Sequence, residues 1–229
     1  MARTTGSDGT RTEEAIRQAA IELIAARGFE AMTLRELADK VGLKAGSIYR
    51  YFPSKAQLLV ALMVTHLQFL LEQWRLEHPV DAAPPEQLRA FVDFHIRMHT
   101  LRRREVFVAN MELRSLSPDD HRRVVALRKR YEQQLTRILA AGCASGDFAV
   151  PDPKVCAFAI LAMLTGTGTW YQEAGRIKQR ELIALYTGLV MRCVGRPDDL
   201  AGSVPDRLEA ARGPARKSRK APGVALETH

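Results

Sequence analysis

Apolar residues recur along most of this chain at spacings of three and four, which is the period of an amphipathic helix. The first such run extends from Glu13 to Arg27, and Gly28 supplies a stop for a helix there. Alternation with a period of two, the signature of a half-buried strand, is nearly absent. The pattern therefore predicts an all-α protein.

Capping residues and prolines divide the pattern into separate helices. Thr33 with Glu36 three residues later is a capping-box signature, and Ser54, Ser117 and Asp152 stand before later apolar runs. Proline ends a helix because it cannot donate to the hydrogen-bond ladder, and Pro53 is placed to do so. The predicted helices cover residues 13–27, 34–41, 45–52, 55–78, 86–101, 104–113, 118–142, 155–173 and 178–194.

Composition restricts the class of protein. The chain has 229 residues, of which 46% are apolar and 26% charged, as is usual for soluble globular proteins. Three widely separated cysteines indicate reduced thiols, the N-terminus lacks the apolar core of a signal peptide, and the most apolar run (155–171) contains two glycines and is too short to span a bilayer. We therefore expect a cytoplasmic protein with no membrane segment.

The net charge of +8 makes a polyanionic partner plausible, but only 9 basic against 7 acidic residues fall in residues 1–55. The residue types at particular positions carry more information than the net charge. Two short predicted helices flank Gly42-Leu43-Lys44, which is the helix-turn-helix pattern that offers its second helix to the major groove of DNA. The alternative is two helices that merely pack in a bundle.

Hydroxyls and cations in this segment suit phosphate oxygens, whereas Arg35, Lys44 and Ala45 could meet base edges. The predicted DNA-contacting residues are Thr33, Arg35, Lys44, Ala45, Ser47, Tyr49, Arg50, Tyr51 and Lys55.

The stretch GFEAMTLRELADKVGLKAGSIYRYFPSK at 28–55 closely resembles the DNA-binding domain of the TetR/AcrR family of bacterial one-component repressors. The resemblance implies an all-helical homodimer that binds double-stranded operator DNA and pairs through its last two helices. It also implies a DNA-binding domain (12–55) followed by an effector-binding and dimerisation domain (56–195). Composition predicts a flexible polar arm (1–11) before them and, from four prolines and the basic run 216–220, a disordered basic tail (196–229) after them.

The regulatory half resembles the branch of that family that controls lipid and steroid catabolism, on residues 110–118, 128–132 and 169–171. Members of that branch commonly sense acyl-CoA thioesters, so the resemblance implies such an effector. The chain departs from the branch at Gln172-Glu173, where the branch has an Arg-Pro pair. A hydrophobic drug or another ligand without coenzyme A is the alternative effector.

Residues that could form an effector cavity are methionines, aromatics and a histidine on the apolar faces, with arginines for phosphates. The predicted contacts are Phe91, His95, Met98, Met111, Tyr131, Met163, Trp170 and Arg176, with the basic runs 102–104 and 128–130 nearby. Each could equally be plain core or solvated surface.

Catalytic and metal-binding patterns are weak in this sequence. His95 and His99 share a helical face, but no third ligand stands at a convincing spacing, so we expect no metal. No nucleophile elbow or phosphate-binding glycine loop appears, so we expect neither a cofactor nor an enzyme. A helical carrier or enzyme without a role on DNA is the alternative from another class.

Overall fold

The computed structural model describes residues 5–195, and the predicted basic tail lies outside the described residues. All regular secondary structure within 5–195 is helical, which confirms the predicted fold class. The helices are α1 (Thr5–Arg27), α2 (Leu34–Lys40), α3 (Ala45–Ile48), α4 (Lys55–Glu77), α5 (Pro84–Leu101), α6 (Arg103–Met111), the 3-10 helix η1 (Glu112–Ser115), α7 (Pro118–Ser145), α8 (Pro153–Trp170) and α9 (Gln179–Val194).

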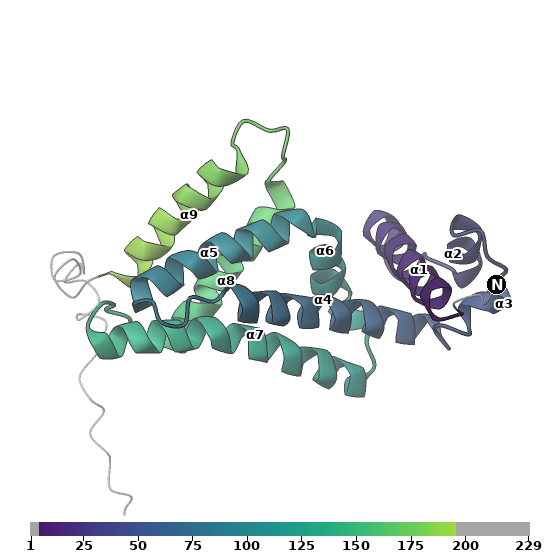
Figure 1. Cartoon of the computed structure of the whole chain (residues 1–229), viewed down its shortest axis with the longest axis horizontal. Coiled ribbons are helices and arrows are strands. Elements are labelled where there is room, and N and C mark those ends of the chain that lie inside the picture. Colours follow the sequence, from purple (N-terminus) through teal and green to yellow (C-terminus); the bar gives the residue numbers. More distant parts are fainter. Residues whose placement is uncertain (1–4, 196–229) are drawn as a thin grey trace, which may run out of the picture.

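Two hydrophobic cores share the long helix α4, which runs from the α1–α3 end of the molecule into the bundle of α5, α7, α8 and α9 (Figure 1). The N-terminal core contains α1–α3 and the first half of α4, from Leu58 to Leu67. The C-terminal core contains the end of α4, where Trp74 packs 5.0 Å from the ring of Phe91. The predicted boundary at 55/56 therefore falls at the start of a helix that belongs to both cores.

Among the helices that the structure describes, α4 is long and apolar enough to cross a membrane by length and composition alone. Ten of its residues are buried, nine of them in the two hydrophobic cores, which is the burial of a core helix.

Helices α1 and α3 have boundaries that differ clearly from the prediction. Helix α1 begins at Thr5, so residues 5–11 of the predicted flexible arm are helical. Extending an existing helix costs far less than starting one, and Glu13 and Glu14 both pair with Arg17 in the following turn. Helix α3 ends at Ile48 rather than Phe52, and turns closed on the Ser47 and Ile48 carbonyls lead from there to Pro53.

Gly142 was predicted to end α7, but the helix continues to Ser145 and ends at Gly146, whose φ of 79° suits glycine. Gly142 serves packing instead, because the ring of Phe148 occupies the space that a Cβ atom would fill there.

We expect Gly142→Ala to destabilise the protein by about 1–3 kcal/mol, because the overpacking against Phe148 exceeds the gain in helix propensity. Gly166→Ala in α8 is the matched control, since its added Cβ meets nothing within 4 Å. Thermal unfolding should show a lower Tm for Gly142→Ala and an equal or higher Tm for Gly166→Ala. An increase in Tm for Gly142→Ala would contradict this packing role.

Candidate functional sites

The helix-turn-helix is built by local hydrogen bonds around α2. Thr33 Oγ1 accepts a hydrogen bond from the Glu36 N–H at 3.2 Å, as predicted for an N-cap. The second half of the predicted capping box does not form, because the Glu36 carboxylate pairs with Arg27 of α1. Gly42 takes a φ of 68° in the turn, and the Leu43 N–H closes it on the Ala38 carbonyl at 2.9 Å. The turn therefore holds α3 against α2.

One face of this motif is buried and the other is exposed. Leu37, Ile48 and Phe52 lie in the N-terminal core, with exposures of 0%, 0% and 4%. The exposed residues of the predicted DNA-contacting set are Thr33, Arg35, Lys44, Ala45, Tyr49 and Arg50, and Ser47 is half-buried. The outer face thus combines three cations with hydroxyl groups, which is the chemistry that DNA phosphates require.

Two predicted DNA contacts are engaged inside the protein. The Lys55 ammonium donates to the Glu30 carbonyl at 3.0 Å and lies 4.3 Å from the centre of the Phe29 ring. Tyr51 is half-buried against the N-terminal core. Only one of the three Lys55 N–H donors is used in this way, so the ammonium can still meet a phosphate.

A buried carboxylate connects the two halves of the molecule. Glu112, at the start of η1, is 7% exposed, and its Oε1 accepts the Phe29 N–H at 3.0 Å. Its Oε2 accepts the Ser115 hydroxyl at 3.0 Å. Sequence reasoning gave Glu112 no role, since its partner lies 83 residues away.

A second connection runs through surface ion pairs. Arg104 of α6 lies 3.7 Å from Glu22 of α1, and Glu22 lies 3.1 Å from Lys40 of α2. These charges are well exposed, so they add little stability and act chiefly on orientation.

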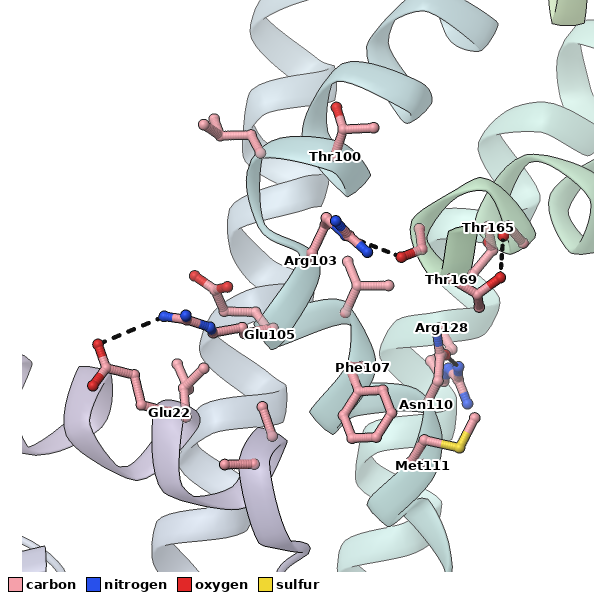
Figure 2. Close-up of a pocket in the computed structure, with 18 of the residues that line it drawn as sticks. Glu22, Thr100, Arg103, Glu105, Phe107, Asn110, Met111, Arg128, Thr165 and Thr169 are labelled. Atoms are coloured by element: carbon pink, nitrogen blue, oxygen red, sulfur yellow. Dashed lines mark hydrogen bonds and ion pairs between the residues drawn. The ribbon is translucent and has the colours of Figure 1, made fainter. Parts of the chain in front are cut away.

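A groove of about 1420 Å³ lies between α1, α6 and α8. Figure 2 shows Glu22 of α1 on one side of α6, and Thr165 and Thr169 of α8 on the other. Arg103, Arg104 and Arg128 line the groove; Arg103 Nε donates to the Gly168 carbonyl at 3.1 Å, and Arg128 donates to the Asn110 side-chain oxygen. A molecule in this groove would touch both halves of the protein.

A smaller cavity of about 180 Å³, here called the inner cavity, adjoins this groove. The two share the lining residues Val106, Asn110, Arg128, Leu161 and Thr165. The remaining lining residues of the inner cavity are His66, Leu67, Leu70, His95, His99, Ala109, Tyr131 and Glu132.

The inner cavity has an unusually polar wall. The two ring nitrogens of His95 lie 3.1 Å from the Tyr131 hydroxyl and 3.1 Å from the Thr165 hydroxyl. The His99 ring stacks on that of His95 at 3.6 Å and donates from Nδ1 to the His95 carbonyl at 3.0 Å. His66 is buried, and its Nδ1 has no hydrogen-bond partner among the described residues.

Burial keeps all three rings neutral at pH 7. Burial lowers the pKa of His66 to about 3, helped by the charges of His99, Arg102 and Arg128. Burial also lowers the pKa of His99 to about 4, although its bond to the His95 carbonyl opposes the shift, and it lowers the pKa of His95 well below 6.5. Burial raises the pKa of Tyr131, so its hydroxyl keeps its proton.

The predicted effector residues do not converge on one place. His95 and Tyr131 line the inner cavity, and Met111 lines the groove. Phe91 and Met98 instead lie in the packed C-terminal core, and Met163 packs against that core half-buried. Trp170 and Arg176 line a separate hollow of about 280 Å³ after α8. Periodicity identifies the inward face of a helix but not where neighbouring helices leave a gap.

The residues that sequence reasoning missed are His66, Asn110, Leu161 and Thr165. A histidine on the apolar face of α4 was the available signal for His66. The two histidines considered as a metal pair are stacked on each other, and the described part of the chain holds no group of three side chains suited to a metal ion.

Helices α8 and α9 expose apolar side chains. Val155 and Phe158 of α8 are 59% and 47% exposed, and Leu185 and Leu189 of α9 are 56% and 40% exposed. Trp170, at the end of α8, is also about half exposed, and its ring lies 6.5 Å from that of Tyr186 of α9. Such a concentration of exposed apolar surface is typical of an interface with another protein.

Comparison with known proteins gives matches to both halves of the chain. Residues 16–62 match the family described as "Bacterial regulatory proteins, tetR family", and residues 81–194 match "Tetracyclin repressor-like, C-terminal domain". The chain is 25% identical to the HTH-type transcriptional repressor KstR2 of Mycolicibacterium smegmatis over 194 residues, which are 83% of this chain and 94% of that protein.

Solved structures give the same picture. A bacterial regulatory protein of the tetR family from Rhodococcus RHA1 superposes with a TM-score of 0.77 and 31% identity, over 82% of this chain and 98% of that one. The structure of AibR in complex with isovaleryl coenzyme A and operator DNA superposes with a TM-score of 0.73 and 26% identity, over 78% and 97% of the two chains.

The neutral buried histidines predict that acid destabilises the protein. Histidines of the unfolded chain take up protons near pH 6.5, whereas His66 and His99 stay neutral in the folded protein until about pH 3 and pH 4. The contribution of these histidines to the free energy of unfolding is therefore fully present above pH 6.5. It falls as pH drops from 6.5 toward 4, by up to about 1.4 kcal/mol per pH unit for each ring.

Urea unfolding at several pH values between 7.5 and 4.5 tests this. We expect His66→Leu to reduce the slope of the unfolding free energy against pH by the equivalent of about one proton. His121→Asn, at an exposed position of α7, is the control. An unchanged slope in His66→Leu would show that His66 is protonated in the folded protein.

Removing the Glu112 carboxylate leaves the Phe29 N–H buried without an acceptor. We expect Glu112→Ala to cost about 1–3 kcal/mol of unfolding free energy, and Glu112→Gln to cost less, because its amide oxygen can still accept. Chemical denaturation of the three proteins measures the difference. Equal stability of Glu112→Ala and the parent chain would contradict the importance of this bond.

Proposed function

The chain belongs to the TetR family of bacterial regulatory proteins, and from this premise we propose that it is a homodimeric repressor that an acyl-CoA thioester releases from its operator. The family consists of DNA-binding transcriptional regulators rather than enzymes, in agreement with the expectation from the sequence. The observation that carries the proposal is the arginine-lined groove between α1 and α6, where a ligand contacts the DNA-binding and regulatory halves together.

Dimerisation is supported by two features. The exposed apolar residues of α8 and α9 need a cover, and a second copy of the same helices supplies one by symmetry. Helix α3 has only four residues, so a single copy presents few groups to DNA. Two copies that engage half-sites about one helical turn apart multiply the contacts.

An acyl-CoA effector is supported by the size and charge of the groove. Its volume of about 1420 Å³ exceeds the roughly 300–1,000 Å³ of common ligand pockets, which favours a large ligand. Arg103 and Arg104 are exposed at its wall, where guanidinium groups suit the phosphates of coenzyme A. AibR, whose structure was solved with isovaleryl coenzyme A, has a similar fold.

Release from DNA follows because the effector and helix α1 bind the same arginine of α6. A phosphate that binds Arg104 competes with Glu22, and Glu22 is also the partner of Lys40 in α2. The effector lowers DNA affinity only as far as it binds the DNA-incompetent arrangement more tightly. The operator-bound and effector-bound states thus differ in how α1–α3 sit against α6. We infer that this takes place in the cytoplasm, where operator DNA is found.

A hydrophobic ligand without coenzyme A is the second candidate effector. Leu101, Phe107 and Met111 line the groove, with exposures of 74%, 44% and 52%, and offer apolar surface to such a molecule.

A fluorescence-polarisation assay with labelled DNA from upstream of the gene tests the proposal, using isovaleryl-CoA as the probe. We expect DNA binding by the parent chain and its reversal by isovaleryl-CoA. Arg103→Gln should raise the concentration needed about tenfold, because it removes a charge-assisted contact. Arg176→Gln, in the separate hollow, is the matched control and should behave as the parent does.

The outcomes separate the parts of the proposal. Absence of an operator-sized footprint at moderate salt would contradict the role as a repressor of its own region. If only apolar or cationic compounds reverse DNA binding, the role as a DNA-binding regulator stands and the acyl-CoA effector is wrong.

A further inference from the structure

We propose that the inner cavity holds the acyl end of the effector and selects a short acyl group that carries a hydroxyl or oxo oxygen, rather than a plain saturated chain. This inference rests on the proposed function, in which the groove holds the coenzyme A part. It concerns the 180 Å³ space that adjoins the groove at Arg128 and Thr165.

Size limits the acyl group. A volume of 180 Å³ corresponds to about six water molecules at roughly 30 Å³ each. An acyl group of four carbons with its thioester oxygen and one further oxygen has six non-hydrogen atoms. A long fatty chain exceeds this volume and would extend beyond the inner cavity.

One side chain of the cavity wall, His66, has a ring nitrogen without a hydrogen-bond partner among the described residues. His66 is 4% exposed and neutral, and its Nδ1 has no hydrogen-bond partner among the described residues. A buried polar atom without a partner is costly, so proteins rarely keep one unless a ligand or water satisfies it. Since His66 lines the cavity, an oxygen of the ligand that reaches this nitrogen would accept from it or donate to it, depending on the tautomer of the ring.

Further polar groups of the wall offer both donors and acceptors. The Thr165 and Tyr131 hydroxyls each contact His95 and keep further hydrogen-bonding capacity. Arg128 is a partly buried cation, with its pKa lowered by burial, and its side chain bonds the neutral Asn110 rather than a carboxylate. The wall therefore recognises oxygen rather than hydrocarbon.

The charge balance favours a neutral oxygen over a carboxylate. Glu132 lies one turn beyond Arg128 on α7 and also lines the cavity, so a second negative charge there would be repelled. A hydroxyl can donate to Glu132, and an oxo group can accept from Arg128. The remaining wall is apolar and suits the methylene groups: Leu67, Leu70, Val106, Ala109 and Leu161.

Calorimetric titration of the full-length protein with a matched set of four-carbon thioesters tests this: butyryl-CoA, 3-hydroxybutyryl-CoA and acetoacetyl-CoA, with free coenzyme A alongside. We expect at least one oxygen-bearing thioester to bind at least about tenfold more tightly than butyryl-CoA, since the plain chain leaves buried polar groups unpaired. Butyryl-CoA binding as tightly as both others would overturn the inference while leaving the acyl-CoA proposal intact.

Two variants identify the responsible groups. Thr165→Val and His66→Leu should each reduce the preference for the oxygen-bearing ligand to less than about threefold. Thr169→Val is the matched control, because Thr169 lies one turn along α8, lines only the groove and bonds the Gly166 carbonyl. Equal loss of preference in Thr169→Val would overturn the assignment to the inner cavity.

Failure of the inference and failure of the proposed function give different results. If none of the thioesters and no free coenzyme A binds, while operator DNA still does, both the effector class and this inference are wrong. Thermal unfolding of each variant verifies that it is folded before titration. If His66→Leu does not fold, Thr165→Val and the parent ligand series still decide the matter.

Discussion

The hydrogen bond from the Phe29 N–H to the buried Glu112 carboxylate is the constraint on which the arrangement of the two halves depends. Helix α4 passes through both cores, and side chains of α6 and α7 pack beside it in the N-terminal core. Glu112 adds a directional bond to this packing, because it fixes the loop after α1 to the end of α6. The same loop carries Glu30, whose carbonyl accepts a hydrogen bond from Lys55 at the start of α4. The DNA-binding half is therefore held at two points.

Helix α6 is the element through which a ligand can act on this arrangement. Its residues Val108 and Ala109 are buried in the N-terminal core, while Val106 and Asn110 line both the groove and the inner cavity. A nine-residue helix with one face in the DNA-binding half and another on a ligand cannot move at one face alone. Coupling between the sites therefore requires no long chain of contacts, only a rigid short helix with two occupied faces.

Local signals in the sequence predicted the fold, whereas contacts between residues far apart in the sequence could not be predicted from it. The helical period and the caps at Thr33, Ser54, Ser117 and Asp152 were all confirmed, since each depends on residues within one or two turns. The prediction that Gly142 ends α7 was wrong, because the glycine is needed for packing against Phe148, which lies beyond the helix. Phe91 fits a lining residue and a core residue equally well by period, and only its packing on Trp74 decides between them. The inner cavity could not be predicted from the period either, because side chains from five helices, α4 to α8, meet there.

The basic residues form two sets, and their separation bears on how regulation works. Arg35, Lys44 and Arg50 are exposed on the helix-turn-helix, whereas Arg103, Arg104 and Arg128 line the groove beyond α1. An anionic effector in the groove therefore does not compete with DNA phosphates for the same cations. Under the proposed function, competition for charge does not displace the operator, so release requires a change in geometry. The bond from Glu112 of η1 to Phe29 and the ion pair from Arg104 of α6 to Glu22 are two contacts that can carry such a change to the helix-turn-helix.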